Sequence, residues 1–178
     1  MITPVNLISY NYLLRFSSIN GSVDQKLIRS SVQRAQRIHL MPYLNKCLYD
    51  KIIELTKEYV ADPATGLGLP ANAAYKKLVD EYILDALLYW VLVELYPQLV
   101  SKVDNSNIIK HVPTDSETLS IQEMEVLVHK ERERALNFTN RMIKYLCDNP
   151  SLFPEYTNCS ECQNKTNDPY EEDEFIAI

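Results

Sequence analysis

The chain has 178 residues, of which 46% are hydrophobic and 24% are charged. This balance is typical of globular domains, and it excludes a fully disordered chain, a collagen-like chain and a coiled-coil rod. The formal charge of −6 is concentrated at one end, because residues 148–178 hold eight acidic residues and one lysine, whereas residues 1–147 carry a net +1. A nearly neutral body lacks the concentrated basic face that coating a nucleic acid requires.

The chain shows no sign of export or membrane insertion. Its first residues lack a basic stretch followed by an apolar run, so we expect no secretory signal. The most apolar stretch, Ile83 to Tyr96, contains Asp85 and Glu94 and is shorter than the ~20 residues of a membrane-spanning helix. The sequence therefore predicts a protein made in the cytoplasm, with its four cysteines reduced and with no membrane partner.

The first half of the chain predicts two helices and a loop. Ser22 and Gln25 form a capping box that opens a helix ending at Pro42. An apolar stripe at helical spacing predicts a second helix over residues 43–59, and the short connection between the two predicts an antiparallel pair. Residues 61–71 hold most of the glycines and several prolines, which predicts a loop.

The second half predicts two longer helices that flank a β-hairpin. Residues 73–96 become apolar on nearly all sides, which is typical of a central helix, and Pro97 is expected to end it. Apolar residues around the turn-like Asp104–Asn107 predict a hairpin over about residues 99–112. A capping box formed by Ser120 and Glu123 then opens a helix that reaches Cys147.

These elements predict the all-α class: a four-helix bundle-like domain over residues 1–150, with the β-hairpin inserted between the last two long helices. Residues 151–178, acidic and aromatic, are expected to form an extended tail that orders on a partner. An isolated hairpin is marginally stable, so we expect this one to pair with a neighbouring copy. The residues assigned to that subunit contact are Val100, Val103, Ile108, Ile109 and Val112, and those assigned to docking by the tail are Phe153, Tyr156, Tyr170 and Phe175.

The sequence contains little that indicates catalysis, and no catalytic residue or cofactor is predicted. Cys159 and Cys162 have the spacing of half a zinc site, or they are uncommitted thiols, because no second pair stands at a recognised spacing. His129 and Glu133 stand four residues apart inside a run of charged residues, which favours a surface ion pair over a metal or acid–base pair. The mildly basic residues of the first two helices could face DNA or an acidic partner, or form an ordinary polar face.

The order of elements resembles the helical head-to-tail adaptors of tailed bacteriophages, also called head completion or connector proteins, most closely those of crAss-like and other Bacteroides-type phages. The resemblance covers residues 20–156. The strings that carry it are Gln33-Arg34-Ala35-Gln36-Arg37-Ile38, Met41-Pro42-Tyr43-Leu44, Leu48-Tyr49-Asp50, Tyr82 to Trp90, Lys102-Val103, Ile109-Lys110, Tyr145 to Asn149 and Phe153-Pro154-Glu155-Tyr156.

This resemblance implies a non-enzymatic structural protein of the virion neck, assembled in the cytoplasm of a bacterial host. The family forms rings, dodecameric by resemblance, between the portal protein above and the next tail or ring protein below. Genomic DNA passes through the ring without sequence-specific binding. The resemblance also implies that the hairpin reaches over a neighbouring subunit and that the C-terminal segment reaches toward the portal.

Two other classes of protein stay open at this point. A cytosolic, antitoxin-like regulator would use the basic first helices to bind DNA, and a salt-sensitive shift of duplex DNA would favour it. A zinc-thiolate enzyme would use Cys159 and Cys162, and stoichiometric zinc in the purified protein would favour that alternative.

Overall fold

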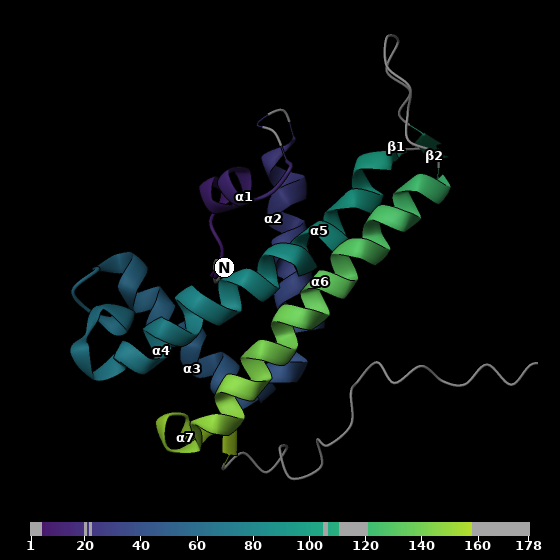
Figure 1. The fold of residues 1–178 in the computed structure, drawn as a ribbon. Coiled ribbons are helices and arrows are strands. Elements are labelled where there is room, and N and C mark those ends of the chain that lie inside the picture. The colour runs from purple at the N-terminus through teal and green to yellow at the C-terminus, as the bar shows by residue number, and fades with distance from the viewer. Residues whose placement is uncertain (1–4, 20, 22, 105–106, 111–120, 158–178) are drawn as a thin grey trace, which may run out of the picture.

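The computed structural model describes residues 5–19, 21, 23–104, 107–110 and 121–157, and this part of the chain is mostly helical (Figure 1). Its α-helices are α1 (Tyr10–Phe16), α2 (Gln25–Arg34), α3 (Met41–Ala61), α4 (Ala73–Leu78), α5 (Leu84–Val100), α6 (Ile121–Asp148) and α7 (Pro154–Thr157). Short π-helical and 3₁₀ turns extend or join them: η1 (Ala35–Leu40), η2 (Gly66–Gly68), η3 (Pro70–Asn72), η4 (Val79–Ile83) and η5 (Pro150–Leu152). The prediction of the all-α class is confirmed.

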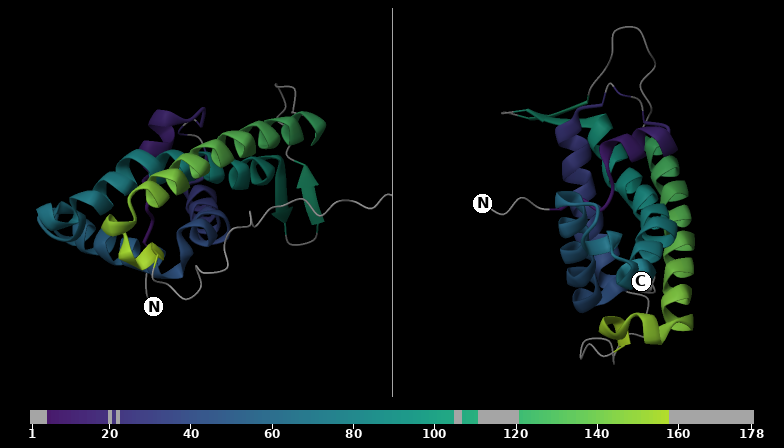
Figure 2. Two further views of the ribbon diagram at one scale, coloured as in Figure 1. Left: turned by 60° about the horizontal axis from the view of Figure 1, so that its bottom comes forward. Right: turned by 90° about the vertical axis from the view of Figure 1, so that its left-hand side faces the viewer.

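Helix α5 is the centre of the fold. It packs along α6 on one side and against α2 on another, and the views in Figure 2 keep α5 and α6 side by side. Its side chains at Leu87, Trp90, Val91 and Leu95 are almost fully buried, as expected for a helix that is apolar on nearly all sides. None of the helices in the described residues is long and apolar enough to cross a membrane.

The first two predicted helices are joined differently from the prediction. Helices α2 and α3 follow each other through η1 without a loop, so Pro42 lies inside a continuous helical stretch and does not end it. Asp24, and not Ser22, caps α2, because its side chain accepts a hydrogen bond from the Lys26 N–H at 2.8 Å. Ser22 itself lies outside the described residues.

The helical chain changes direction at Asn45, inside α3. This residue has φ 55° and ψ 164°, a backbone conformation that normally requires glycine. Its buried side chain stabilises the bend at both ends, because Oδ1 accepts from the Leu48 N–H at 3.0 Å and Nδ2 donates to the Tyr156 carbonyl at 3.1 Å. The bend therefore joins the N-terminal helices to the end of the described chain.

Replacing Asn45 by alanine is expected to lower the free energy of unfolding by about 2–3 kcal/mol, because the helix cap and a buried hydrogen bond are lost while the strained backbone remains. Asn45→Gly is the matched variant, since it loses the same hydrogen bonds but relieves the strain, and it should cost less. Urea denaturation of both variants measures the difference. Equal losses for alanine and glycine would show that the backbone at residue 45 is not strained.

The predicted loop after α3 is present, and two glycines shape it. Gly66 has φ +53°, and a Cβ atom there would collide with the Leu55 carbonyl of α3. A Cβ atom at Gly68 would collide with the Pro63 carbonyl. The loop can lie against the end of α3 because both positions lack a side chain.

The third predicted helix continues past its predicted end. Helix α4 runs through η4 into α5, and Pro97 lies inside α5 and does not end it. Residues 99 and 100, expected to open the hairpin, are therefore helical. Two four-residue strands follow, β1 (Ser101–Asp104) and β2 (Asn107–Lys110), and they pair antiparallel with Ser101 opposite Lys110. Val112 and Ser120 lie outside the described residues.

Candidate functional site

The end of the α5–α6 pair that carries β1 and β2 is the candidate site, and we call it the apex. The last residue of α5, Val100, leads directly into β1, so the strands extend from the end of the helix (Figure 1). Within the described part of the chain, the two strands pair only with each other. One edge of each strand is therefore without a strand partner in this part, and such edges are templates for pairing with another chain.

Apolar surface lies next to the strands on both helices of the apex. Leu99 of α5 is 37% exposed and Val126 of α6 is 58% exposed. Between the two helices lies an open cavity of about 320 Å³, lined by Pro97, Met124, Glu125, Val128, His129 and Arg132. Exposed apolar side chains beside unpaired strand edges are typical of a surface that another protein covers.

The charged run of α6 begins at the apex and is only partly solvated. His129 and Glu133 form the predicted surface ion pair, because His129 Nε2 lies 3.4 Å from Glu133 Oε1 and both side chains are more than 60% exposed. Glu131, in contrast, is buried, and its two carboxylate oxygens accept hydrogen bonds from Arg134 Nη1 at 3.0 and 3.1 Å. The run of charged residues is therefore not solvated at Glu131.

Glu131 is buried because of its place on α6. It stands four residues before Ala135 and eight before Thr139, so it lies on the stripe that faces the core. Its charge is compensated by the neighbouring Arg134, as a buried carboxylate requires. Glu131 lies within six consecutive polar residues, which indicate a solvated segment. Only its spacing to the apolar stripe of α6 indicates that it faces the core.

A polar network below the apex fixes α2, η1, α5 and α6 against one another. Trp90 Nε1 donates to Thr139 Oγ1 at 3.0 Å, and the Trp90 ring stacks on His39, with ring centres 4.2 Å apart. His39 Nε2 donates to Glu94 at 2.8 Å, and Arg34 Nε donates to the other oxygen of Glu94 at 2.9 Å. Sequence reasoning missed these contacts because they join residues 49 to 60 positions apart.

The Glu94 carboxylate gives this network a pH dependence. The hydrogen bond from His39, and then that from Arg34, hold the pKa of Glu94 below its ordinary value of 4.5, although burial acts in the opposite direction. A lowered pKa in the folded state stabilises the protein above pH 4.5, and this stabilisation is lost as the pH falls through the folded-state pKa.

The melting temperature of the wild type should therefore fall more steeply between about pH 5 and about pH 3 than the melting temperature of Glu94→Gln, because this variant has no carboxylate to protonate at residue 94. The Glu54→Gln variant is the control, because Glu54 is exposed and pairs only at 3.5 Å with Lys51. Its pH profile should follow the wild type. Identical profiles for Glu94→Gln and the wild type would show that the Glu94 contacts do not contribute to stability.

The segment after α6 is part of the folded body, at least to Thr157. The predicted extended tail starts at residue 151, but η5 and α7 fold back onto the helices. Phe153 is fully buried, so it belongs to the core and is not available to dock a partner. Tyr156 is partly buried and packs against the same core. The prediction that Phe153 docks a partner is therefore wrong, because aromatic contacts with Tyr75 and Tyr145 bury its side chain. The docking role of Tyr156 stays a prediction.

Besides Val112, four predicted site residues lie outside the described residues: Tyr170, Phe175, Cys159 and Cys162. Within the described ranges, no group of three or more His, Cys, Asp or Glu residues could hold a metal ion. Cys147 is an exposed, free thiol.

Comparison with known proteins adds a family to this description. The chain belongs to DUF6712, a family of unknown function, whose model matches residues 40–166. This range begins at the end of η1 and includes α3, α5, the strands and α6. No curated protein and no solved structure matches the chain.

Proposed function

We propose that this protein is a head-to-tail adaptor of a tailed bacteriophage, forming a ring between the portal and the tail. The single observation that carries the proposal is the apex: two strands with unpartnered edges in the described part of the chain, flanked by exposed Leu99 and Val126. The resemblance of residues 20–156 to such adaptors is the reason for proposing a ring as the assembly. The protein then acts as a structural component without catalytic activity, at the neck of the virion.

In this proposal the strands add to a neighbouring subunit and close the ring. Edge-to-edge pairing satisfies backbone N–H and C=O groups, and the apolar apex surface becomes buried at the same time. A closed ring leaves no free edge, which limits the assembly to a defined size. The proposed contact residues are Val100, Val103, Ile108, Ile109 and Val112, with Leu99 and Val126 added from the structure.

The charge pattern also supports an adaptor through which DNA slides. Several basic side chains of the first helices are paired with carboxylates: Arg34 with Glu94, Lys46 with Asp50 and Lys51 with Glu54. Such pairing weakens attraction to phosphate. It weighs against the DNA-binding regulator, which needs these residues to contact DNA.

The proposal is tested by sedimenting particles from a culture that produces the phage encoding this chain and measuring chain abundance by mass spectrometry. The expected result is that the chain travels with intact particles at a fixed, low ratio to the capsid protein. If it stays in the soluble fraction, the adaptor function is wrong. A gel-shift assay with duplex DNA at two salt concentrations would then test the regulator.

A further inference from the structure

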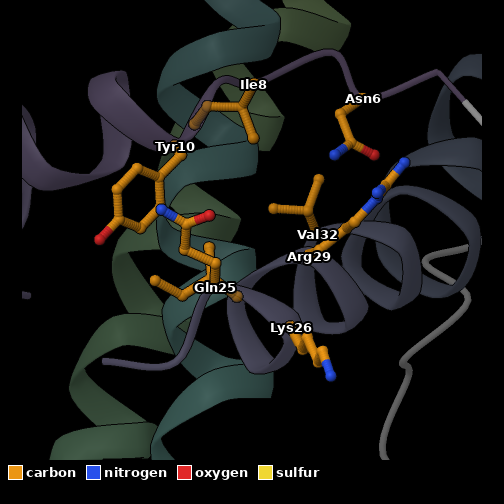
Figure 3. Close-up of a pocket in the computed structure, with 8 residues that line it drawn as sticks. Asn6, Ile8, Tyr10, Gln25, Lys26, Arg29 and Val32 are labelled. Atoms are coloured by element: carbon orange, nitrogen blue, oxygen red, sulfur yellow. The ribbon is translucent and has the colours of Figure 1, made fainter. Parts of the chain in front are cut away.

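A second surface, far from the apex in sequence, carries features that the adaptor function does not use. A cavity of about 350 Å³ lies between residues 5–10 and α2 (Figure 3). Its floor is apolar, because Ile8, Ile28 and Val32 are buried there. Polar groups stand around this floor, and Figure 3 shows the Arg29 side chain extending toward Asn6. The residues lining the cavity are Asn6, Ile8, Tyr10, Gln25, Lys26, Ile28, Arg29 and Val32.

The rim of this cavity is positively charged. Lys26 and Arg29 line the cavity, and both side chains are exposed. No ion pair among the described residues involves either of them. The nearest acidic residue in sequence, Asp24, caps α2 through the Lys26 N–H. Lys26 and Arg29 therefore differ from Arg34, Lys46 and Lys51 of the same helices, which are paired with carboxylates.

We propose that the acidic C-terminal segment Tyr170–Phe175 of the same chain docks on this cavity. The segment has four consecutive carboxylates, Glu171 to Glu174, between two aromatic residues. An aromatic side chain fits an apolar floor of this size, while the carboxylates face the basic rim. Residues 158–178 contain six acidic residues and one lysine, so the whole segment is attracted to this side of the molecule.

The segment is long enough to reach the cavity within one chain. The Tyr156 carbonyl lies against Asn45, at 3.1 Å from Asn45 Nδ2. From Asn45 to Arg29 the helical chain rises about 24 Å, at 1.5 Å per residue. The 13 residue-to-residue steps from Thr157 to Tyr170 span up to about 43 Å when extended. Docking within one chain therefore requires no partner, and the short linker gives it an effective concentration in the millimolar range.

Photo-crosslinking of the full chain, with p-benzoylphenylalanine in place of Phe175, tests the proposal. At low salt the main crosslink is expected within one chain, to residues 5–10 or 25–32. The double variant Lys26→Glu/Arg29→Glu should lower its yield at least about fivefold, because two charge pairs become repulsive. Added salt should lower the wild-type yield in the same direction, because the contact is exposed.

Two further variants make the result specific. Lys57→Glu is the matched control, because Lys57 is an exposed base on α3 outside the cavity, and it should leave the crosslink unchanged. Adding Glu171→Lys and Glu172→Lys to the double variant should restore the crosslink. Crosslinks to another surface, crosslinks between two chains, or a yield insensitive to Lys26→Glu/Arg29→Glu would each overturn the proposal. The test needs no ring, so its outcome is independent of the adaptor function.

Discussion

Deleting residues 101–110 is expected to leave a folded monomer that no longer enters phage particles. The strands lie at the end of the α5–α6 pair, and the contacts that hold this pair together, including the Trp90–Thr139 hydrogen bond, lie below them. Residues 111–120 would then connect the two helices. Their ten residues can span about 33 Å, whereas packed helices lie about 8–10 Å apart, so the chain can close.

Removing the strands abolishes the proposed edge pairing between subunits, so the loss of assembly should be complete and not graded. Far-UV circular dichroism and thermal unfolding measure the fold, and mass spectrometry of sedimented particles measures incorporation. The double variant Ile108→Asp/Ile109→Asp tests the same contact with no change in chain length. Val60→Asp is the matched control, because Val60 is 73% exposed on α3 and should tolerate a charge. Normal incorporation of the deletion variant would remove the strands from the adaptor mechanism.

The long helices could be predicted because their signal is periodic and local. Residues 73–96 and 119–147 show apolar spacings that persist over many turns, and the structure places helices over nearly the same ranges. Helix ends were predicted less well. Pro42 and Pro97 were taken as helix ends, yet the helical stretch from α2 through η1 into α3 continues past Pro42, and α5 continues past Pro97 to Val100.

The features that sequence reasoning missed depend on contacts between distant residues. The bend at Asn45 has no local glycine to indicate it, and its geometry is held by the Tyr156 carbonyl, 111 residues further along the chain. Nothing in the sequence distinguishes His39 from the other polar residues, and only the structure shows that its ring stacks on Trp90. The cavity beside α2 forms only because residues 5–10 pack against this helix. The helical periodicity of the sequence does not predict that contact.

The boundary between body and tail shows the same limitation. Phe153 lies in a stretch where aromatic residues alternate with prolines, a composition typical of an extended segment. Its burial comes from α4 and α6, because its ring makes edge-on contacts with Tyr75 and Tyr145, at ring-centre distances of 5.5 and 5.8 Å. Tyr145 in turn stacks on Tyr82, and Tyr75 donates a hydrogen bond to Glu155 at 2.7 Å. The aromatic cluster thus fixes Phe153 against α4 and α6, and the Tyr75–Glu155 hydrogen bond joins α7 to α4.

Replacing Phe153 by alanine is therefore expected to be among the most destabilising single changes in the chain. Truncating a fully buried phenylalanine removes its apolar surface from the core and leaves a cavity, which lowers the free energy of unfolding by about 3–5 kcal/mol. For a chain of this length the melting temperature should fall by roughly 6–20 °C. Tyr75 and Tyr145 lose their edge-on partner at the same time, which adds to the loss.

Leu152→Ala is the matched control, because Leu152 is the preceding residue and is 43% exposed. Its effect should stay within about 0.5 kcal/mol, as is usual for a surface substitution. Differential scanning calorimetry of the two variants compares neighbouring apolar residues that differ mainly in burial. If Phe153→Ala were as mild as Leu152→Ala, the segment would belong to the tail, as its composition indicates. A large difference places the end of the folded body after Phe153, and a partner-docking tail can then begin only beyond it.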